Sequence, residues 1–303
     1  MLTSDLSTSI QRRSAVPSAQ ITFSSTDFYA LMDEEIESKL IPLILRNLEE
    51  FYAYDFKYSI TAGQGSYSIP TRAIAGKLRD VQIISSTDAD SIYPLARLDV
   101  SDLYASTSSN SKVLIKKNGF YLKGNNVVMY PTPTVTQNYL NLEHYIRPNL
   151  CVDPSVCGLI SSINAGTNQI TVVALPSNIT TATPVDFVRV NSGFECTAID
   201  QIITAVSTNT ITLSATLPTS LAVGDYVCQA KQSCVVQVPQ ELLPLLSQYV
   251  VVRVLAAQGD GQALQAAISE LTKLEENAML LISPRVDGKP KRATNSRGMS
   301  RFV

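Results

Sequence analysis

The chain contains an internal repeat, and this repeat limits the folds that its middle section can adopt. The segment GTNQITVVALP (166–176) recurs as STNTITLSATLP (207–218), and each copy is followed by a strand with an acid before an aromatic residue, at 185–190 and 224–229. A period of roughly forty residues indicates a duplicated supersecondary unit. Neither copy has enough apolar surface to fold alone, so the two should pair into one small β-barrel or sandwich over about 155–232, inserted between other elements.

The sequence on both sides of this module predicts helices. SSTD at 24–27 offers an N-cap, and apolar residues then recur at spacings of three and four, which predicts one long amphipathic helix over about 28–54, bent at Pro42. After the module, 239–258 and the stripe from Leu264 to Leu281 predict an αα-hairpin. These apolar stripes can be buried only against one another. We therefore expect a helical bundle formed by a long N-terminal helix and the C-terminal αα-hairpin.

The remaining sequence predicts β-structure and two arms. Alternating runs around glycine-containing turns predict antiparallel β-hairpins at 57–70 and 118–133 and a further strand at 139–146. A short helix is expected near 100–105, between the two hairpins. The first 23 residues and the last 20 are polar and non-periodic, which predicts extended N- and C-terminal arms. The predicted fold class is α+β. Its parts are an N-terminal arm (1–23), a helical and β core (24–154 and 233–283), the inserted module (155–232) and a C-terminal docking arm (284–303).

Composition narrows the classes of function. Apolar residues make up 45% and charged residues 17% of the chain, as in ordinary globular proteins. The net charge of −2 lacks the basic excess that a broad phosphate-binding surface needs. The sequence shows neither a signal-peptide pattern nor a run of about eighteen apolar residues, so we expect a protein that spans no membrane. Five cysteines without CxxC spacing indicate reduced thiols.

The residue patterns predict no enzyme, metal site or cofactor. His144 is the single histidine and shares an apolar strand face, so we interpret it as a core or interface residue. Cys151 and Cys157 have no second pair to complete a zinc site. The acids at 33–35 are consecutive on a helix and point in different directions, which suits the helix dipole better than paired-carboxylate catalysis.

Several segments resemble head-to-tail adaptor (connector) proteins of tailed bacteriophages, especially the short-tailed ones. The N-terminal part of the resemblance is RRSAVPSAQITFSSTDFYALMDEEIESKLIPLILRNLEEFY (12–52), followed by YSIPTRAIAGKLRDV (67–81) with its Y-x-I-P-x-R-A pattern. FYLKGNNVVMYPTP (120–133), PQELLPLLSQYVVVRVLAAQGD (239–260) and LISPRVDGKPKR (281–292) also fit the family pattern. Each segment is short, and none contains a catalytic motif.

The resemblance implies a structural protein of the virion neck, assembled in the cytoplasm of a host bacterium. Such adaptors form a homo-oligomeric ring, here expected to hold about twelve copies, under the portal protein. The ring extends the channel through which viral DNA passes non-specifically, and it provides the platform for a tail-tube, nozzle or other neck protein. Three alternatives stay open: a tail-tube or nozzle protein, a neck protein with cell-wall hydrolase activity, and a DNA-binding protein that uses the basic tail.

The resemblance also implies that the C-terminal arm reaches the portal. Contact with DNA in the channel and plain disorder are the alternatives for this arm. The candidate portal-docking residues are Arg285, Lys289, Lys291, Arg292, Arg297, Arg301 and Phe302. The candidate subunit-interface residues are Arg12, Arg13, Phe28, Tyr29 and Tyr52.

Overall fold

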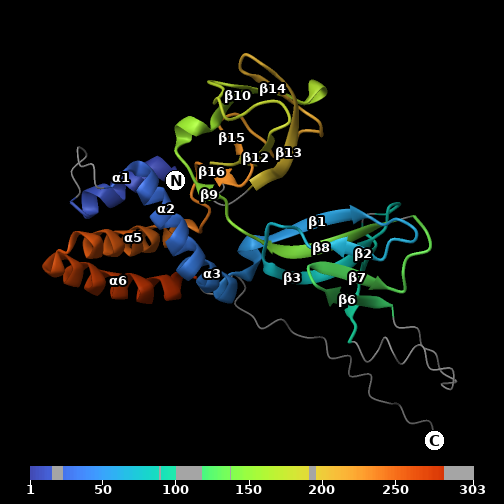
Figure 1. Ribbon diagram of the computed structural model, residues 1–303, viewed down its shortest axis with the longest axis horizontal. Helices are drawn as coiled ribbons and strands as arrows, with labels where there is room; N and C mark the ends of the chain where they lie inside the picture. Colours follow the sequence, from blue (N-terminus) through green and yellow to red (C-terminus); the bar gives the residue numbers. More distant parts are fainter. Residues whose placement is uncertain (16–22, 89, 100–117, 137, 191–195, 283–303) are drawn as a thin grey trace, which may run out of the picture. The chain divides into compact units, whose positions relative to one another are not determined.

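The chain divides into two compact units, shown in the computed structural model of Figure 1. Unit 1 comprises Met1–Ser4 and Glu49–Val238, and unit 2 comprises Asp5–Leu48 and Pro239–Val303. The residues that the structure describes are 1–15, 23–88, 90–99, 118–136, 138–190 and 196–282. The short helix expected near 100–105 and the docking arm 284–303 lie outside these ranges. The mixed α and β composition agrees with the predicted class.

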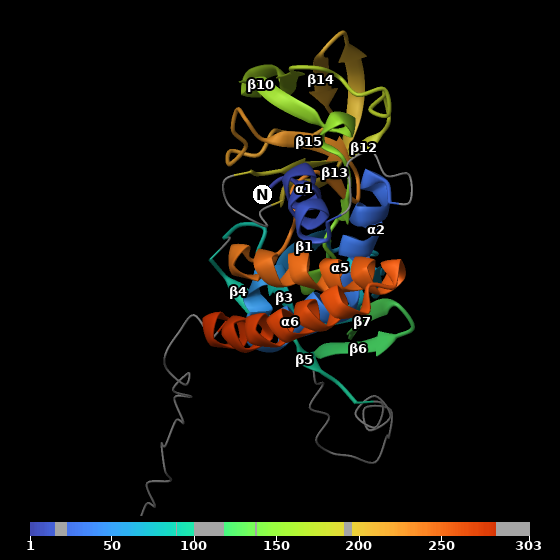
Figure 2. The same cartoon turned by 90° about the vertical axis from the view of Figure 1, so that its left-hand side faces the viewer.

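Unit 2 is helical in its described residues and takes its helices from both ends of the chain. Its elements are most of α1 (Thr3–Arg13), α2 (Ser25–Glu35), the π-helical turn η1 (Ile36–Leu40), α3 (Ile41–Asn47), the 3-10 turn η5 (Gln240–Leu242), α5 (Leu243–Gln258) and α6 (Gly261–Leu281). The capping box of α2 is formed by Ser24 and Asp27, as the SSTD sequence indicated. The helices α5 and α6 lie side by side, coloured orange and red in Figure 2.

The predicted helical bundle with a long N-terminal helix is wrong, because the chain between 28 and 54 is not one helix. The α2 conformation ends at Glu35, and in η1 the Ile41 N–H bonds to the Ile36 carbonyl, five residues back instead of four. Pro42 has no N–H and its ring crowds the carbonyl four residues earlier, which favours a widened turn here. Helix α3 ends at Asn47, and the chain continues through the 3-10 turn η2 (Glu49–Tyr52) into a strand.

The extended N-terminal arm is also wrong, because residues 3–13 form helix α1. Leu6 and Ile10, one helical turn apart, are 2% and 0% exposed. Apolar residues spaced by four lie on one helix face, and burying that face stabilises a helix whose other residues are mostly Ser and Thr. Two apolar residues among so many hydroxyls gave too weak a periodic signal to identify the helix from sequence.

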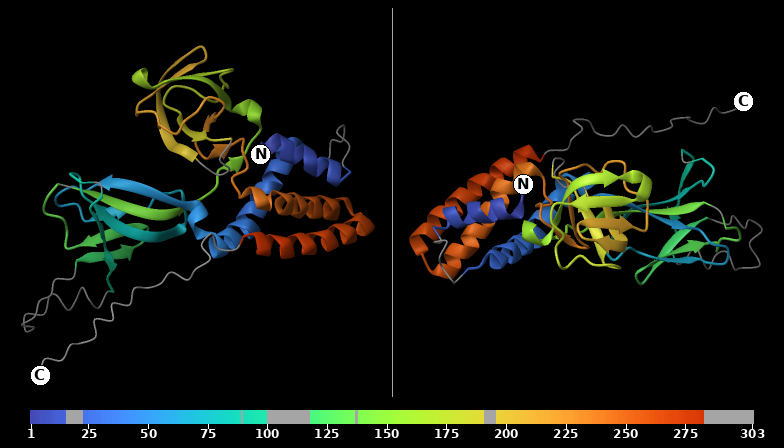
Figure 3. Two further views of the ribbon diagram at one scale, coloured as in Figure 1. Left: turned by 180° about the vertical axis from the view of Figure 1, so that it is seen from behind. Right: turned by 90° about the horizontal axis from the view of Figure 1, so that it is seen from above.

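In unit 1, two four-stranded sheets share one core. The first has the order β1 (Ala53–Ser59), β8 (Tyr139–Ile146), β3 (Ala73–Ile84), β4 (Ile92–Pro94), and the second has β2 (Ser66–Ser68), β7 (Asn126–Tyr130), β6 (Gly119–Lys123), β5 (Ala96–Arg97). Buried residues of both sheets belong to one apolar cluster, for example Leu140 and Leu142 of β8 with Tyr67 of β2 and Val127 of β7. The sheets are drawn in blue and green in Figure 3.

Of the two predicted hairpins, one is confirmed and the other is wrong. Strands β6 and β7 pair through a turn at Gly124, which has a φ of +59°. In contrast, β1 pairs with β8 and β2 pairs with β7, so the hairpin expected at 57–70 does not form. The glycine turn between β1 and β2 carries the chain from one sheet to the other, and a local turn signal cannot specify which partner each strand takes. The strand predicted at 139–146 is confirmed as β8.

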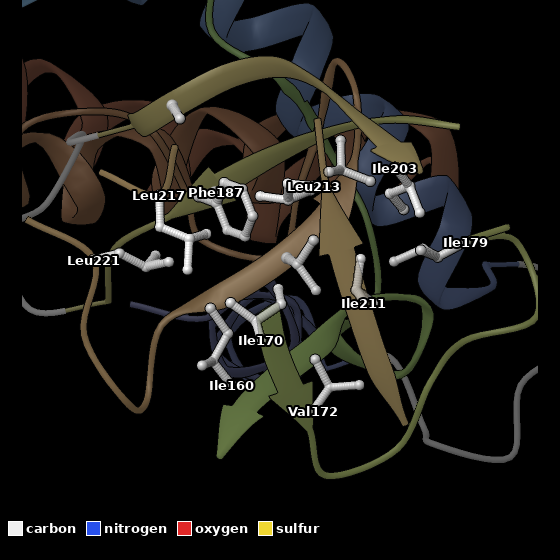
Figure 4. Close-up of a cluster of buried hydrophobic side chains, with 13 residues drawn as sticks. Ile160, Ile170, Val172, Ile179, Phe187, Ile203, Ile211, Leu213, Leu217 and Leu221 are labelled. Carbon is white, nitrogen blue, oxygen red and sulfur yellow. The ribbon is translucent and has the colours of Figure 1, made fainter. Parts of the chain in front are cut away.

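The repeat forms a closed barrel, one of the two architectures that the duplication predicted. Its strands are β10 (Gly158–Asn164), β11 (Gln169–Val172), β12 (Pro184–Val188), β13 (Cys196–Ser207), β14 (Thr210–Leu213) and β15 (Tyr226–Gln229), with the 3-10 turns η3 (Pro154–Val156) and η4 (Ala165–Thr167). The order β10-β11-β14-β13-β12-β15 pairs β11 with β14 and β12 with β15, the equivalent strands of the two copies. The copies are therefore related by an approximate two-fold axis through the barrel. Its core is shown in Figure 4, with Ile170 and Ile211, opposite one another in register, both 0% exposed.

A buried charged network joins the barrel to the turn before β3. Asp186 on β12 is 0% exposed, and its two carboxylate oxygens accept from Arg72 Nη1 (2.8 Å) and Nη2 (2.9 Å), Asn149 Nδ2 (2.8 Å) and the backbone N–H groups of Lys231 and Asp200 (2.9 and 2.8 Å). Arg72 also donates to the side chains of Asp200 and Asn149, so all five of its N–H groups have acceptors. The network is fully satisfied, which is the condition under which buried charges are tolerated.

The Arg72→Met variant should lose about 3–5 kcal/mol of unfolding free energy, because it leaves the Asp186 carboxylate buried without its counter-charge. Urea unfolding followed by far-ultraviolet circular dichroism measures the loss. Arg79→Met is the matched control, since Arg79 pairs with Glu143 at 2.9 Å but is 30% exposed, and this change should cost about 1 kcal/mol or less. Equal losses in the two variants would show that the Arg72 network has no special role.

His144 of β8 is in the core of unit 1. It is 0% exposed, its Nδ1 lies 3.2 Å from the Leu142 carbonyl oxygen, and its ring meets the Tyr54 ring edge-on at 6.0 Å. Desolvation lowers the pKa of this imidazole below its ordinary value of 6.5. The folded chain therefore holds His144 neutral at a pH where the unfolded chain already takes up a proton.

We expect stability to decrease as the pH falls below about 6.5, with a slope of up to about 1.4 kcal/mol per pH unit until the folded-state pKa is reached. The sign follows because the unfolded state binds more protons in this window. His144→Phe should flatten the dependence, since the chain has no other histidine. Thermal unfolding of both proteins at a series of pH values gives the two slopes. Parallel slopes would contradict this assignment.

Candidate assembly surface on unit 2

Helix α6 packs on α5 through small residues. It begins after Gly259, whose φ of +75° ends α5, and Asp260 caps it by accepting from the Ala263 N–H at 3.0 Å. The buried residues of α6 itself are Ala267 and Ala278, whereas α5 is buried on most of its surface. Alanines at the contact allow close approach of the two helices, and the Gln248 side chain ties them by donating to the Ala267 carbonyl at 2.9 Å.

The rest of α6 exposes large apolar side chains. Ile268 and Met279 are 47% and 46% exposed, and Leu280 and Leu281 at the end of the helix are 77% and 62% exposed. Ile268 and Met279 are eleven residues apart, about three turns, so they lie on the same side of the helix. We call these four residues the α6 patch. Leu280 and Leu281 lie about 100° and 200° further round the helix axis than Met279, so the four side chains are spread over α6 and do not share one face. Large apolar side chains exposed on one helix are candidates for a protein contact.

The helices beside the patch are held by an ion network that includes a buried carboxylate. The Glu35 side chain is 0% exposed. One of its carboxylate oxygens accepts a hydrogen bond from Arg253 Nε at 2.6 Å. The other oxygen forms an ion pair with Lys39 Nζ at 2.7 Å, but the two groups are not aligned for a hydrogen bond. Lys39 also lies over the ring of Tyr249, 4.0 Å from its centroid. The Tyr249 hydroxyl donates to the Glu275 carboxylate of α6 at 2.7 Å. Burial and this carboxylate raise the pKa of the Tyr249 hydroxyl. The network joins η1, α5 and α6, so the patch is presented on a fixed scaffold.

A groove of about 480 Å³ opens next to the N-terminal half of α6. Its apolar lining comes from Val251 and Leu255 of α5 and from alanines of α6, and its polar lining includes Arg13 and Glu270. The Arg13 guanidinium donates to the Gln248 side chain at 3.3 Å and lies 3.8 Å from the Glu270 carboxylate. An apolar floor with a charged rim suits a protruding apolar side chain of a protein partner.

Only two of the five predicted interface residues are on the surface of the chain. Arg12 and Arg13 are exposed at the end of α1. Phe28 and Tyr29 of α2 are 0% and 4% exposed, and Tyr52 is 0% exposed with its hydroxyl donating to the Gln237 carbonyl at 3.1 Å. Burial also raises the Tyr52 pKa. These three aromatic residues belong to the core of the chain, so their prediction as interface residues is wrong. The prediction failed because an apolar stripe in a sequence does not distinguish a core face from an interface.

The predicted docking residues of the C-terminal arm lie outside the described part of the chain. In contrast, the residues of the Y-x-I-P-x-R-A pattern are described, and Tyr67, Ile69, Arg72 and Ala73 are all buried. Sequence reasoning missed the role of Arg72, although an arginine directly before a strand of mostly apolar residues was a signal for a buried ion pair. It also missed the α6 patch, because the same apolar spacing predicts a buried face.

No protein-family model matches the sequence, and no curated protein is significantly similar to it. Among the described residues, every helix is either too short or too polar to cross a membrane.

We expect the chain to self-associate through the α6 patch. Replacing Met279 and Leu280 together by Gln should weaken association about tenfold or more, while unfolding free energy changes by less than about 0.5 kcal/mol because both side chains are already in water. Light scattering over a concentration series measures association. Val173→Gln with Val223→Gln is the matched control, since these residues are 61% and 62% exposed in unit 1. A wild-type chain that stays monomeric at all concentrations would contradict the expectation.

Proposed function

We propose that the chain is a structural virion protein, a head-to-tail adaptor whose copies form a ring under the portal of a tailed bacteriophage. The observation that carries the proposal is the α6 patch, four exposed apolar side chains on a helix that ends directly before the basic C-terminal segment. A ring needs a surface that packs against the next copy, and a neck protein needs a second contact for the head. The two segments proposed for these contacts, α6 and residues 284–303, follow one another in the sequence.

The distribution of charge supports this arrangement. Residues 284–303 carry six basic residues and one acid. Subtracting them from the totals of 24 basic and 26 acidic residues leaves 18 and 25, a net charge of −7 for residues 1–283. An acidic body is suited to a channel through which DNA slides, because a basic lining would hold phosphates by counterion release. The positive charge is concentrated where contact with a protein partner is proposed.

The second proposed contact is between the C-terminal segment and the portal. Arginine forms forked, two-point hydrogen bonds with carboxylates, so Arg285, Arg292, Arg297 and Arg301 are suited to acidic or carbonyl groups on portal subunits. In this arrangement the face of the ring that points away from the portal contacts the tail-tube or nozzle protein.

Deletion of 284–303 should abolish binding to the portal protein of the same phage and leave ring formation intact, because the α6 patch is unchanged. Co-sedimentation with purified portal and negative-stain images of the assemblies measure the two properties separately. A full-length variant with the six basic residues of the segment replaced by Gln separates the effect of charge from that of length, and it should also lose portal binding.

Other outcomes assign a different function. A deletion variant that binds portal normally but loses a lower tail contact would indicate a tail-tube or nozzle protein. Steep, salt-dependent binding of the wild-type chain to duplex DNA, absent from the deletion variant, would indicate a DNA-binding tail.

A further inference from the structure

Three buried cysteines of unit 1 come together on the outside of the barrel. Cys157 follows η3, Cys228 is on β15, and Cys234 follows β16 (Gln232–Ser233), which pairs with β9 (Leu150–Cys151). Their exposed fractions are 6%, 0% and 0%, and their sulfur atoms all lie within 4.8 Å of one another. The Cys228 and Cys234 sulfurs are 4.0 Å apart. All three are free thiols.

The barrel and the N-terminus together build this cluster. Cys228 is opposite Asp186 in the β12–β15 pair, so its side chain points away from the barrel core that contains Phe187 and Val227. The main chain of Cys234 is fixed by the N-terminal segment, where the Thr3 N–H donates to the Cys234 carbonyl at 2.9 Å. Apolar residues that include Val188 and Val235 surround the sulfurs and keep water away.

We propose that Cys157, Cys228 and Cys234 form a binding site for a thiophilic d¹⁰ metal ion, with Zn²⁺ as the ion that fits best. Tetrahedral Zn²⁺ binds thiolates at about 2.3 Å, which places its sulfur ligands about 3.8 Å apart. The 4.0 Å separation of Cys228 and Cys234 is close to this value, and the third sulfur needs to move by about 1 Å or less. This proposal goes beyond the adaptor function and is independent of it.

The cluster supplies three of the four ligands of a tetrahedral site. Among the described residues no carboxylate or imidazole group joins the three sulfurs, so the fourth ligand would come from outside the cluster. Binding of Zn²⁺ converts the three thiols to thiolates, and their protons pass to the solvent.

Two simpler roles explain the cluster less well. A disulfide needs a sulfur–sulfur distance of about 2.05 Å and would leave the third cysteine without a role. Apolar packing does not require three sulfurs at one point, and Cys151 is a nearby example of a buried cysteine that is not part of the cluster. The sequence could not predict the site, because Cys157 and Cys228 come together only when the barrel closes.

The test uses the purified, reduced full-length chain titrated with Zn²⁺ against a chromophoric chelator, and with Co²⁺ as a spectroscopic probe. We expect one Zn²⁺ per chain, a thiolate-to-cobalt charge-transfer band, and Zn²⁺-dependent protection of three cysteines from alkylation in urea, where the metal-free thiols become accessible, as read by mass spectrometry. Cys157→Ser and Cys228→Ala should each reduce Zn²⁺ affinity by roughly 100-fold or more, because loss of a ligand costs more than loss of an outer-shell partner. Cys151→Ala is the matched control and should bind like the wild type.

The alkylation and cobalt measurements on the wild-type chain do not depend on whether a variant folds. A wild-type chain without a charge-transfer band and without protected cysteines would overturn the proposal. Equal loss of binding in Cys151→Ala would also overturn it. A parallel titration with Cu⁺ tests the identity of the ion: one tightly bound Cu⁺ with no Zn²⁺ bound would overturn the assignment to zinc.

Discussion

The paired hydrogen bonds between Arg72 and Asp186 are the interaction on which unit 1 depends. A guanidinium is planar and rigid, so satisfying all five of its N–H groups fixes the positions of Asp186, Asp200 and Asn149 relative to the turn before β3. An unpaired charge at this depth would cost several kcal/mol, so partial formation of the network is unfavourable. The network therefore selects one arrangement of barrel and sheets. It also fixes β12, the strand opposite Cys228.

The two halves of the barrel use equivalent acids differently. Asp186 and Asp225 occupy matching positions in the two copies of the repeat and are 0% and 4% exposed. Asp186 binds Arg72, whereas Asp225 accepts from the Ala222 N–H at 2.9 Å and stabilises the turn before its own strand. The duplicated strand positions are shared, but among the described residues Asp225 has no charged partner like Arg72. A repeat in the sequence thus predicts the symmetric barrel and does not predict which copy carries a long-range contact.

The features that sequence predicted correctly are those that depend on neighbouring residues. The β6–β7 turn, strand β8 and the pair α5–α6 follow from local periodicity and from turn residues such as Gly124 and Gly259. Long-range choices were not predictable. Strands β1 and β2 separate because they pair with β8 and β7, which come much later in the chain. The π turn depends on how the helix responds to Pro42. The buried Tyr52 hydroxyl bonds to Gln237, which is distant in sequence. The candidate sites failed for the same reason, since periodicity marks an apolar face without showing what covers it.

Four residues of the Y-x-I-P-x-R-A pattern, Tyr67, Ile69, Arg72 and Ala73, are buried, so they contribute to folding and not to a surface contact. The proposed contacts of the chain are the α6 patch and the C-terminal segment. The basic segment is attracted by the net charge of −7 on residues 1–283 of its own chain, and it would also be attracted by an acidic partner. Because this attraction is screened beyond about 8 Å at physiological salt, net charge alone would not select the proposed portal partner over the chain's own surface. In the proposed complex, selectivity would come from the geometry of forked arginine contacts, which depends on matched acceptor positions.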